Sequence, residues 1–198
     1  MEVYKNITIK GDNISFNKFI YSPSFTNDEN GICWLDKKAI QLIDSIYTSF
    51  ELSWEKIEGA KSYVVLIINY DASRIFGFPF IHWIVGNIQE NNLEAAANLS
   101  NKQIVQGVNS GVTLATDNSK GIIQDVLPSG YRNASFNSSI GFYPFLTFDR
   151  PCMYTIRVFG INEESIKIDS GFFIDELIQK IYKHIVGIHE KNFWHSGV

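Results

Sequence analysis

The sequence has few cysteines, few prolines and no long hydrophobic run. Among its 198 residues there are 2 cysteines and 5 prolines. Cys33 and Cys152 lie far apart, belong to no CxxC motif and have no histidine at metal-ligand spacing. This pattern argues against a disulfide framework and against a zinc site, so we expect no metal and no cofactor. Two reduced thiols are the simpler interpretation, and a single bridge between them stays an open alternative.

Membrane spans, export signals and excess basic charge are also missing. No apolar run approaches the roughly 18–20 residues that a membrane-spanning helix needs. Residues 1–6 show neither the apolar stretch nor the cleavage pattern of a secretory signal, so we expect a cytoplasmic protein, although a chain whose signal had been removed would look the same. The net charge of −4 at pH 7 argues against non-specific binding of nucleic acid.

Glycine-rich and nucleophile motifs are absent as well. Neither G-x-G-x-x-G nor a P-loop occurs, which leaves nucleotide binding by a glycine-rich loop without support. G-x-S-x-G is also absent, and the serines that stand beside glycines, Ser110 and Ser129, are first of all turn signals.

What the sequence does contain is a series of strand patterns in a chain of single-domain size. Residues 63–68 are apolar on both faces, as in a central strand. Residues 81–88 and 153–161 also have strand character, and residues 50–54 alternate between apolar and polar side chains. The predicted fold class is mainly β, an antiparallel β-sandwich with long loops that forms one domain over residues 1–198.

The segments between these strands are less regular. Residues 7–10 are expected as a short strand. Residues 36–47 have apolar positions at helical spacing but would also suit a decorated loop, and a short helix is expected near residues 93–97. Residues 106–141 are rich in Gly, Ser and Asn, which predicts a long loop with short strands at most.

The C-terminal part predicts an amphipathic helix over about residues 174–189. Apolar residues recur there at spacings of three and four, and the acidic Asp175 and Glu176 fall in the first turn, as the helix dipole prefers. We expect its apolar face to pack on the core rather than on a membrane or a partner.

One carboxylate and one imidazole form a compact pair. Asp71 follows the apolar run 63–68, and His82 begins the next one, so both belong at the ends of neighbouring strands. Such a pair, with nearby backbone amides, suits a small anion. The other histidines, His184, His189 and His195, lie on or beyond the predicted terminal helix. His189 and His195 are near the C-terminus, where we expect fraying rather than function.

Cys152 has two interpretations. A thiol at the start of the strand 153–161 could face the same pocket as His82. The simpler interpretation is a small buried hydrophobe, because free cysteine is among the most buried residue types.

Five short motifs follow one another along the chain: SFELSW at 49–54, NYDAS at 69–73, HWIVGNIQ at 82–89, GFYP at 141–144 and CMYTIRVFGI at 152–161. Together they resemble the phosphatidylethanolamine-binding protein family, also called Raf-kinase-inhibitor-like, and in particular its bacterial YbhB/YbcL branch. In the same order, the family pattern has S-P-x-L-x-W, D-P-D-A-P, H-W-x-x-x-N-I/L-P, a G-Y-x-G-P-x-P-P loop and H-R-Y-x-F-x-V-Y-A-L. Residues 1–48 fit the pattern poorly.

The resemblance implies a PEBP-like β-sandwich with a pocket for a phosphate-like head group. The implied ligand-binding residues are Asn69, Asp71, His82, Cys152, Tyr154, Tyr143 and Pro144. Asp71, His82 and Tyr154 match the family by identity, whereas Asn69 and Cys152 stand by position only, where the family has Asp and His. Both exchanges lower hydrogen-bond capacity, but together they change the charge of the pocket little, so the resemblance implies a partly degenerate or retuned pocket.

Three functions follow from these patterns. The first is a non-catalytic binding protein, not an enzyme, that takes a small anion or phosphorylated head group and whose role could include modulation of a protein partner. The second is a structural or interaction module whose pocket is dead. The third is a hydrolase built on Cys152, His82 and Asp71, which no nucleophile or oxyanion motif supports.

Overall fold

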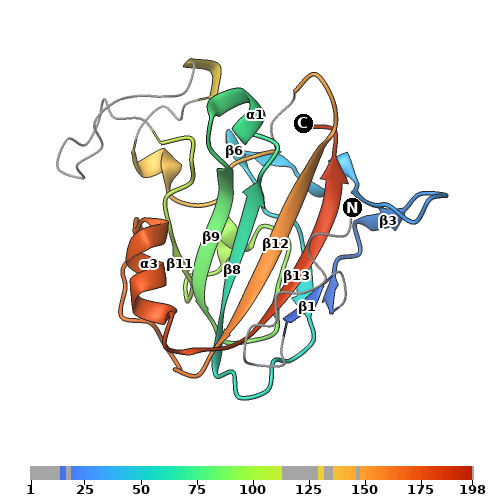
Figure 1. The fold of residues 1–198 in the computed structure, drawn as a ribbon. Helices are drawn as coiled ribbons and strands as arrows, with labels where there is room; N and C mark the ends of the chain where they lie inside the picture. Colours follow the sequence, from blue (N-terminus) through green and yellow to red (C-terminus); the bar gives the residue numbers. More distant parts are fainter. Residues whose placement is uncertain (1–13, 17–18, 113–128, 132–135, 146–147, 198) are drawn as a thin grey trace.

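A large mixed β-sheet runs through the centre of the molecule (Figure 1). The structure is a computed structural model and describes residues 14–16, 19–112, 129–131, 136–145 and 148–197. Within these ranges eight strands make the large sheet, in the order β11 (Val105–Gln106), β9 (Phe80–Ile88), β8 (Ser62–Asn69), β12 (Cys152–Ile161), β13 (Ile185–His195), β4 (Cys33–Leu35) and β3 (Phe25–Asn27), with β1 (Ile14–Phe16) paired to β13.

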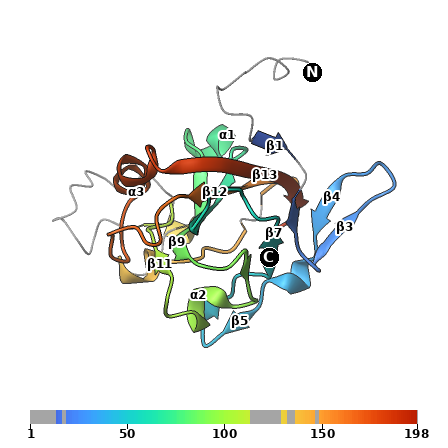
Figure 2. The same ribbon diagram turned by 90° about the horizontal axis from the view of Figure 1, so that it is seen from below.

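A second, smaller layer covers one face of this sheet. It contains β10 (Asn92–Leu93), β7 (Leu52–Trp54) and β2 (Ile20–Tyr21). Figure 2 shows β7 and the helix α2 (Ala97–Ser100) on the side of the sheet away from α1 (Ser73–Phe76) and β1. The main hydrophobic core lies between the two layers and includes Leu52, Trp54, Val65 and Ile67. The predicted β-sandwich is therefore confirmed.

The central strand β8 is buried on both faces, as its unbroken apolar run predicts. Val65 and Ile67 enter the main core, whereas Val64 and Leu66 face a second core on the other side of the sheet. Strands β9 and β12 flank β8, and both pairings are antiparallel. The sheet is not wholly antiparallel, because β13 pairs in parallel with β1 and with β4.

The predicted C-terminal helix exists, but the expected span of about 174–189 was too long. Helix α3 covers Ile174–Ile181, and Leu177 and Ile181 bury its apolar face in the second core. The chain then becomes strand β13, which pairs with β12 along its length. Residues 185–189 follow the helical spacing in sequence, but the open edge of β12 offers them backbone hydrogen bonds and burial in the sheet, and this tertiary pairing overrides the local pattern.

The helical alternative for residues 36–47 was wrong, and the loop alternative was closer. Lys37–Ala39 form a single 3₁₀ turn (η1), capped by the Asp36 side chain, which accepts from the Lys38 amide. A hairpin of β5 (Leu42–Ile43) and β6 (Ile46–Tyr47) follows. The turn residues Asp44 and Ser45 have φ values of 48° and 65°, the left-handed conformation that a two-residue hairpin turn of this kind requires.

The remaining predictions have mixed outcomes. The short helix expected near 93–97 begins only at Ala97, because Asn92 and Leu93 pair with β7 and Ala96 has a left-handed φ of 59° that a helix does not include. The expected strand 7–10 lies outside the described residues, as does much of the predicted loop 106–141. Two 3₁₀ turns, η4 (Ser129–Tyr131) and η5 (Asn137–Ser139), fall in the described part of that loop. No helix in the described ranges is long and apolar enough to cross a membrane.

Candidate functional site

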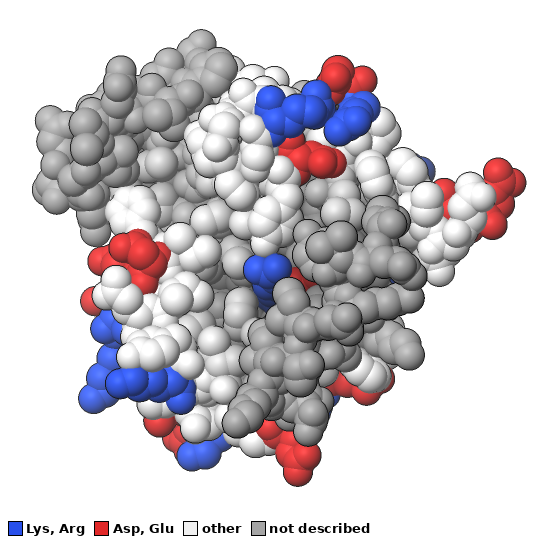
Figure 3. Space-filling model, viewed as in Figure 1, with Lys and Arg blue, Asp and Glu red and all other residues white. Residues whose placement is uncertain are grey.

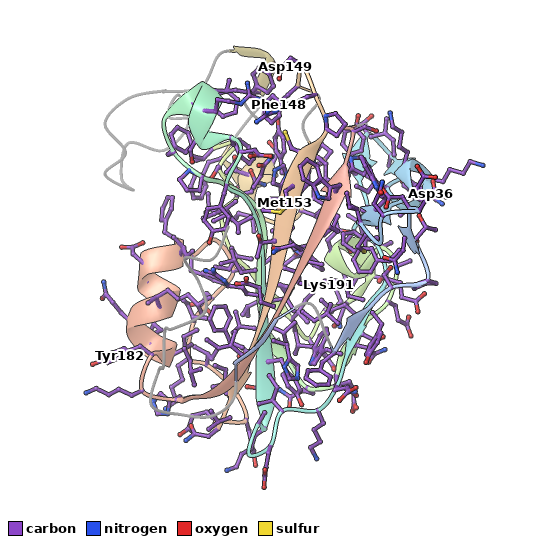
Figure 4. The ribbon with its side chains drawn as sticks, turned by 45° about the vertical axis from the view of Figure 1, so that its right-hand side comes forward. Asp36, Phe148, Asp149, Met153, Tyr182 and Lys191 are labelled. Carbon is purple, nitrogen blue, oxygen red and sulfur yellow. The ribbon has the colours of Figure 1, made fainter. Side chains whose placement is uncertain are left out.

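The residues singled out in the sequence gather at one end of the large sheet. Asn69 ends β8, Cys152 and Tyr154 begin β12, and His82 lies near the start of β9. Asn69 and Tyr154 are paired directly across β8 and β12. Figure 4 shows Met153 near this end, with Phe148 and Asp149 beyond it and Tyr182, which follows α3, at the other end. The sheet therefore brings together residues from three separate sequence motifs.

A β-bulge directs His82 into the main core. In the β8–β9 pair, Ile67 faces Trp83 and Ile68 faces Ile81, so His82 is an extra residue on β9. Bulges of this kind change the direction of a side chain and are common beside functional sites. Strict alternation would place His82 and Trp83 on opposite faces. The bulge instead lets the His82 ring pack against Tyr154 at a centroid distance of 5.2 Å, on the same face as buried Trp83.

The segment with Tyr143 and Pro144 holds the His82 ring in one orientation. His82 Nδ1 lies 3.2 Å from the Tyr143 carbonyl oxygen and 3.1 Å from that of Pro144. A carbonyl can only accept, so Nδ1 carries the proton and donates. The Tyr143 hydroxyl donates to the Tyr131 carbonyl, and burial raises the pKa of this phenol to about 12. Tyr143 and Pro144 thus act on the site through their backbone carbonyls.

Asn69, Asp71 and Cys152 form a second group beside the imidazole. Asn69 is fully buried, and its Oδ1 accepts from the Ala72 amide at 3.2 Å. Asp71 Oδ2 accepts from the Met153 amide at 3.0 Å, which ties the turn after β8 to the start of β12. The Cys152 thiol is buried, and burial is the main cause that raises its pKa, with the Asp71 charge second. A raised thiol pKa disfavours the thiolate form.

Sequence reasoning missed His195. The expectation of a frayed C-terminus was wrong, because His195 is the last residue of β13 and is 1% exposed. It lies directly opposite Cys152 in the β12–β13 pair, and its ring contacts Phe145 at a centroid distance of 5.1 Å. The His82 ring contacts the same Phe145 at 5.2 Å. The only signal was the aromatic run Phe193-Trp194-His195, which has strand character.

Burial keeps both imidazoles neutral. Loss of hydration lowers the pKa of His82 to about 3 and that of His195 to about 4. A charge on His195 would also oppose a charge on His82, which indicates that the two rings are close enough to interact. His195 is influenced further by Lys37, which lowers its pKa, and by Asp36, which raises it.

Three buried polar atoms of this group lack hydrogen-bond partners. Among the side chains that the structure describes, the buried nitrogens without a partner are Trp54 Nε1, Asn69 Nδ2, His82 Nε2 and His195 Nε2. All but the first belong to the end of the sheet described above. A buried polar group without a partner costs about 1–3 kcal/mol, so three of them together mark a place where a ligand or water would be stabilised.

An ion pair and aromatic rings surround the group. Arg74 of α1 pairs with Asp149 at 3.0 Å, and both side chains are exposed. The rings of Phe76, Phe78, Tyr131 and Phe148 pack beside Phe80 and Tyr143. On the face shown in Figure 3, the described basic and acidic side chains are interspersed rather than gathered into one basic field.

Other site types find no support in the described ranges. No group of three His, Cys, Asp or Glu side chains there could hold a metal ion. Both cysteines are free, as expected. Two surface hollows, of about 380 Å³ beside Leu93 and about 270 Å³ beside His184, involve none of the predicted site residues. Of the predicted site residues, Asn69, His82, Cys152 and Tyr154 are buried, whereas Asp71 and Pro144 are partly exposed.

The fold and the site together define the class: the protein is a β-sandwich with a buried cluster of polar side chains at one end of its main sheet. Comparison with known families gives a match to the phosphatidylethanolamine-binding protein model over residues 35–192. The chain therefore belongs to the phosphatidylethanolamine-binding protein family, as the sequence motifs predicted.

Known relatives agree with this assignment. An uncharacterised Bacillus subtilis protein, YxkA, is 28% identical over 145 residues, which cover 71% of this chain and 76% of that protein. The Chlamydia trachomatis homologue CT736 has a similar fold, with a TM-score of 0.60 and 20% identity over 89% of this chain and 95% of that one. Escherichia coli YbcL gives a TM-score of 0.59 and 20% identity over 89% and 96% of the two chains.

Proposed function

We propose that this protein is a non-catalytic binding protein whose site takes a small anion or phosphorylated head group. The observation that carries the proposal is the cluster of unpartnered buried nitrogens on Asn69, His82 and His195. A pocket that had lost its ligand would be expected to fill with apolar groups or to pair these atoms internally, because leaving them unpaired lowers stability. The family name supports a ligand of the phosphate head-group type.

The arrangement gives little support to a Cys/His hydrolase. Activation of a thiol needs an imidazole within hydrogen-bond distance. Both histidines of the site have Nδ1 engaged with backbone groups, and Nε2 of each has no partner. The Cys152 thiol donates instead to the Arg150 carbonyl at 3.7 Å. We therefore propose that Cys152 has no catalytic role.

The interaction module with a dead pocket remains the second candidate. It is favoured by one observation, the enclosure of the site: Asn69, His82 and Cys152 are each at most 1% exposed. Under the binding proposal, a ligand reaches these side chains only through local opening of the surrounding structure, which predicts slow association. Modulation of a protein partner is compatible with either candidate.

Isothermal titration with inorganic phosphate and O-phosphoethanolamine separates the two candidates. We expect the unaltered protein to bind, His82→Ala to lose binding, and His184→Ala to bind normally, because His184 lies at the far end of β13 from the site. If the unaltered protein and His82→Ala give the same absence of heat, the binding proposal is lost and the interaction module is favoured.

A further inference from the structure

The backbone fixes which ring nitrogen of each buried histidine carries the proton. His82 Nδ1 donates to two carbonyls, so its Nε2 carries a lone pair and can only accept while the ring is neutral. His195 Nδ1 accepts from the Gly197 amide at 2.8 Å, so its Nε2 carries the proton and can only donate. The two neutral imidazoles therefore present opposite hydrogen-bonding groups.

Asn69 adds a second donor. Its Oδ1 is occupied by the Ala72 amide, and its Nδ2 has no oxygen or nitrogen partner. The Asn69 side chain also lies close enough to the Cys152 sulfur to lower the pKa of that thiol, but an amide NH₂ carries two hydrogens, so one donor stays available. The site as a whole thus offers one free acceptor, on His82, and two free donors, on Asn69 and His195. All three side chains lie on the inner face of the large sheet and at the same end of it.

We propose that the site selects a tetrahedral oxyanion that still carries one proton, such as the monoanion of a phosphate monoester. This inference rests on the binding function proposed above. The ligand hydroxyl donates to His82 Nε2, and two unprotonated oxygens accept from His195 Nε2 and Asn69 Nδ2. A phosphate diester and sulfate have no hydroxyl, so they would set an oxygen lone pair against that of His82.

The surrounding charges agree with a singly charged ligand. The Asp71 carboxylate lies next to Cys152 and disfavours a dianion, whereas Arg74 and Arg150 favour negative charge. Lys37 and Asp36 act on His195 with opposite signs.

The first experiment compares two ligands that are both mainly monoanions at pH 5.5, by isothermal titration. Methyl phosphate is a monoester with a hydroxyl, and dimethyl phosphate is a diester without one. We expect the monoester to bind at least about tenfold more tightly, because a site built to pair a hydroxyl rejects an analogue that lacks it. Sulfate, a tetrahedral dianion without a proton, should also bind weakly, for want of the hydroxyl and because of its second charge.

The pH dependence then locates the proton. A phosphate monoester loses its second proton near pH 6, so its monoanion falls about 25-fold in abundance between pH 5.5 and 7.5. We expect the apparent affinity for methyl phosphate to fall by a similar factor, while that for dimethyl phosphate stays flat. If both ligands weaken equally, the proton is on an imidazole and the proposal fails.

Variants of His195 test the donor. His195→Phe removes it, whereas His195→Gln keeps an N–H at a similar reach, so the first should weaken monoester binding at least about tenfold and the second much less. Thermal unfolding of each variant checks that it is folded, and His184→Ala is the matched control. Equal binding of monoester, diester and sulfate would overturn this inference but leave the proposed function standing. Loss of all binding in the unaltered protein would overturn both.

Discussion

Cys152 and His195 are direct partners across the antiparallel strands β12 and β13. Opposed residues of such a pair point to the same face, with Cβ atoms about 4.5–5.5 Å apart. The family pattern has histidine at the position of Cys152, and in this chain an imidazole stands on the neighbouring strand at the same level. The substitution that made the pocket look degenerate in sequence is therefore accompanied by a second imidazole beside it.

The double variant that exchanges the side chains of Cys152 and His195 should lose less free energy of unfolding than the sum of its two single substitutions. Cys152→His places a larger group in a filled core and should lower the free energy of unfolding by about 1–3 kcal/mol. His195→Cys should also destabilise, because it leaves a cavity. We expect the double variant to lose at least about 0.5 kcal/mol less than the sum of the two. Urea denaturation measures all three, and strict additivity would argue against direct packing of the pair.

His82 has separable structural and binding roles. His82→Ala removes the donor to the carbonyls of Tyr143 and Pro144 and leaves a cavity, so it should destabilise the protein by about 2–4 kcal/mol. His82→Asn keeps an N–H near the Nδ1 position and should destabilise less, but both variants should lose phosphate binding. Chemical denaturation and titration on the same samples test this, and equal stability of the two variants would contradict it.

Stability should fall on mild acidification. Folding lowers the pKa of His82 to about 3 and of His195 to about 4, from 6.5 for an ordinary histidine. Below pH 6.5 the unfolded chain therefore binds more protons than the folded protein. The free energy of unfolding is therefore highest above pH 6.5, where both histidines are neutral in either state. It falls as the pH drops toward 4, by at most about 1.4 kcal/mol per pH unit for each histidine.

Denaturation curves between pH 7.5 and 5 check this dependence. His195→Phe removes one of the two groups, so its stability should fall less steeply with pH than that of the unaltered protein. If this substitution leaves the slope of stability against pH unchanged, His195 has the same pKa in the folded and unfolded states, and the prediction is wrong.

The two cysteines should differ in reactivity. Burial raises the pKa of both thiols, so the difference between them is access: Cys33 is partly exposed, whereas Cys152 is 1% exposed. We expect iodoacetamide to label Cys33 well before Cys152 in the folded protein, and both in denaturant. Mass spectrometry of the two peptides measures this. Rapid labelling of Cys152 that depended on His82 would instead support the hydrolase interpretation.

The short helix α3 should depend on its buried face. Leu177 is completely buried against the second core, whereas Ile178 is 38% exposed. Leu177→Ala should lower the free energy of unfolding by about 2–5 kcal/mol, and Ile178→Ala by less than about 1 kcal/mol. Similar losses for both would mean that α3 is held by something other than its contacts with the sheet.

The sequence by itself determined the elements whose signals are local. The run 63–68 is apolar on both faces wherever it lies, so it predicts a central strand, and the motifs from Ser49 to Ile161 identified the family. The alternation of residues 50–54 likewise predicts a half-buried strand. These patterns depend on hydrophobic periodicity, which each segment carries independently of the rest of the chain.

The tertiary structure alone decided the C-terminal strand and the chemistry of the site. Residues 185–189 carry a helical spacing, and only the exposed edge of β12 made them a strand. The bulge that directs His82 into the core exists only in the pairing of β8 with β9. The proton positions on His82 and His195 depend on the carbonyls of Tyr143 and Pro144 and on the Gly197 amide. Contacts between segments far apart in the chain create these features, so no local pattern encodes them.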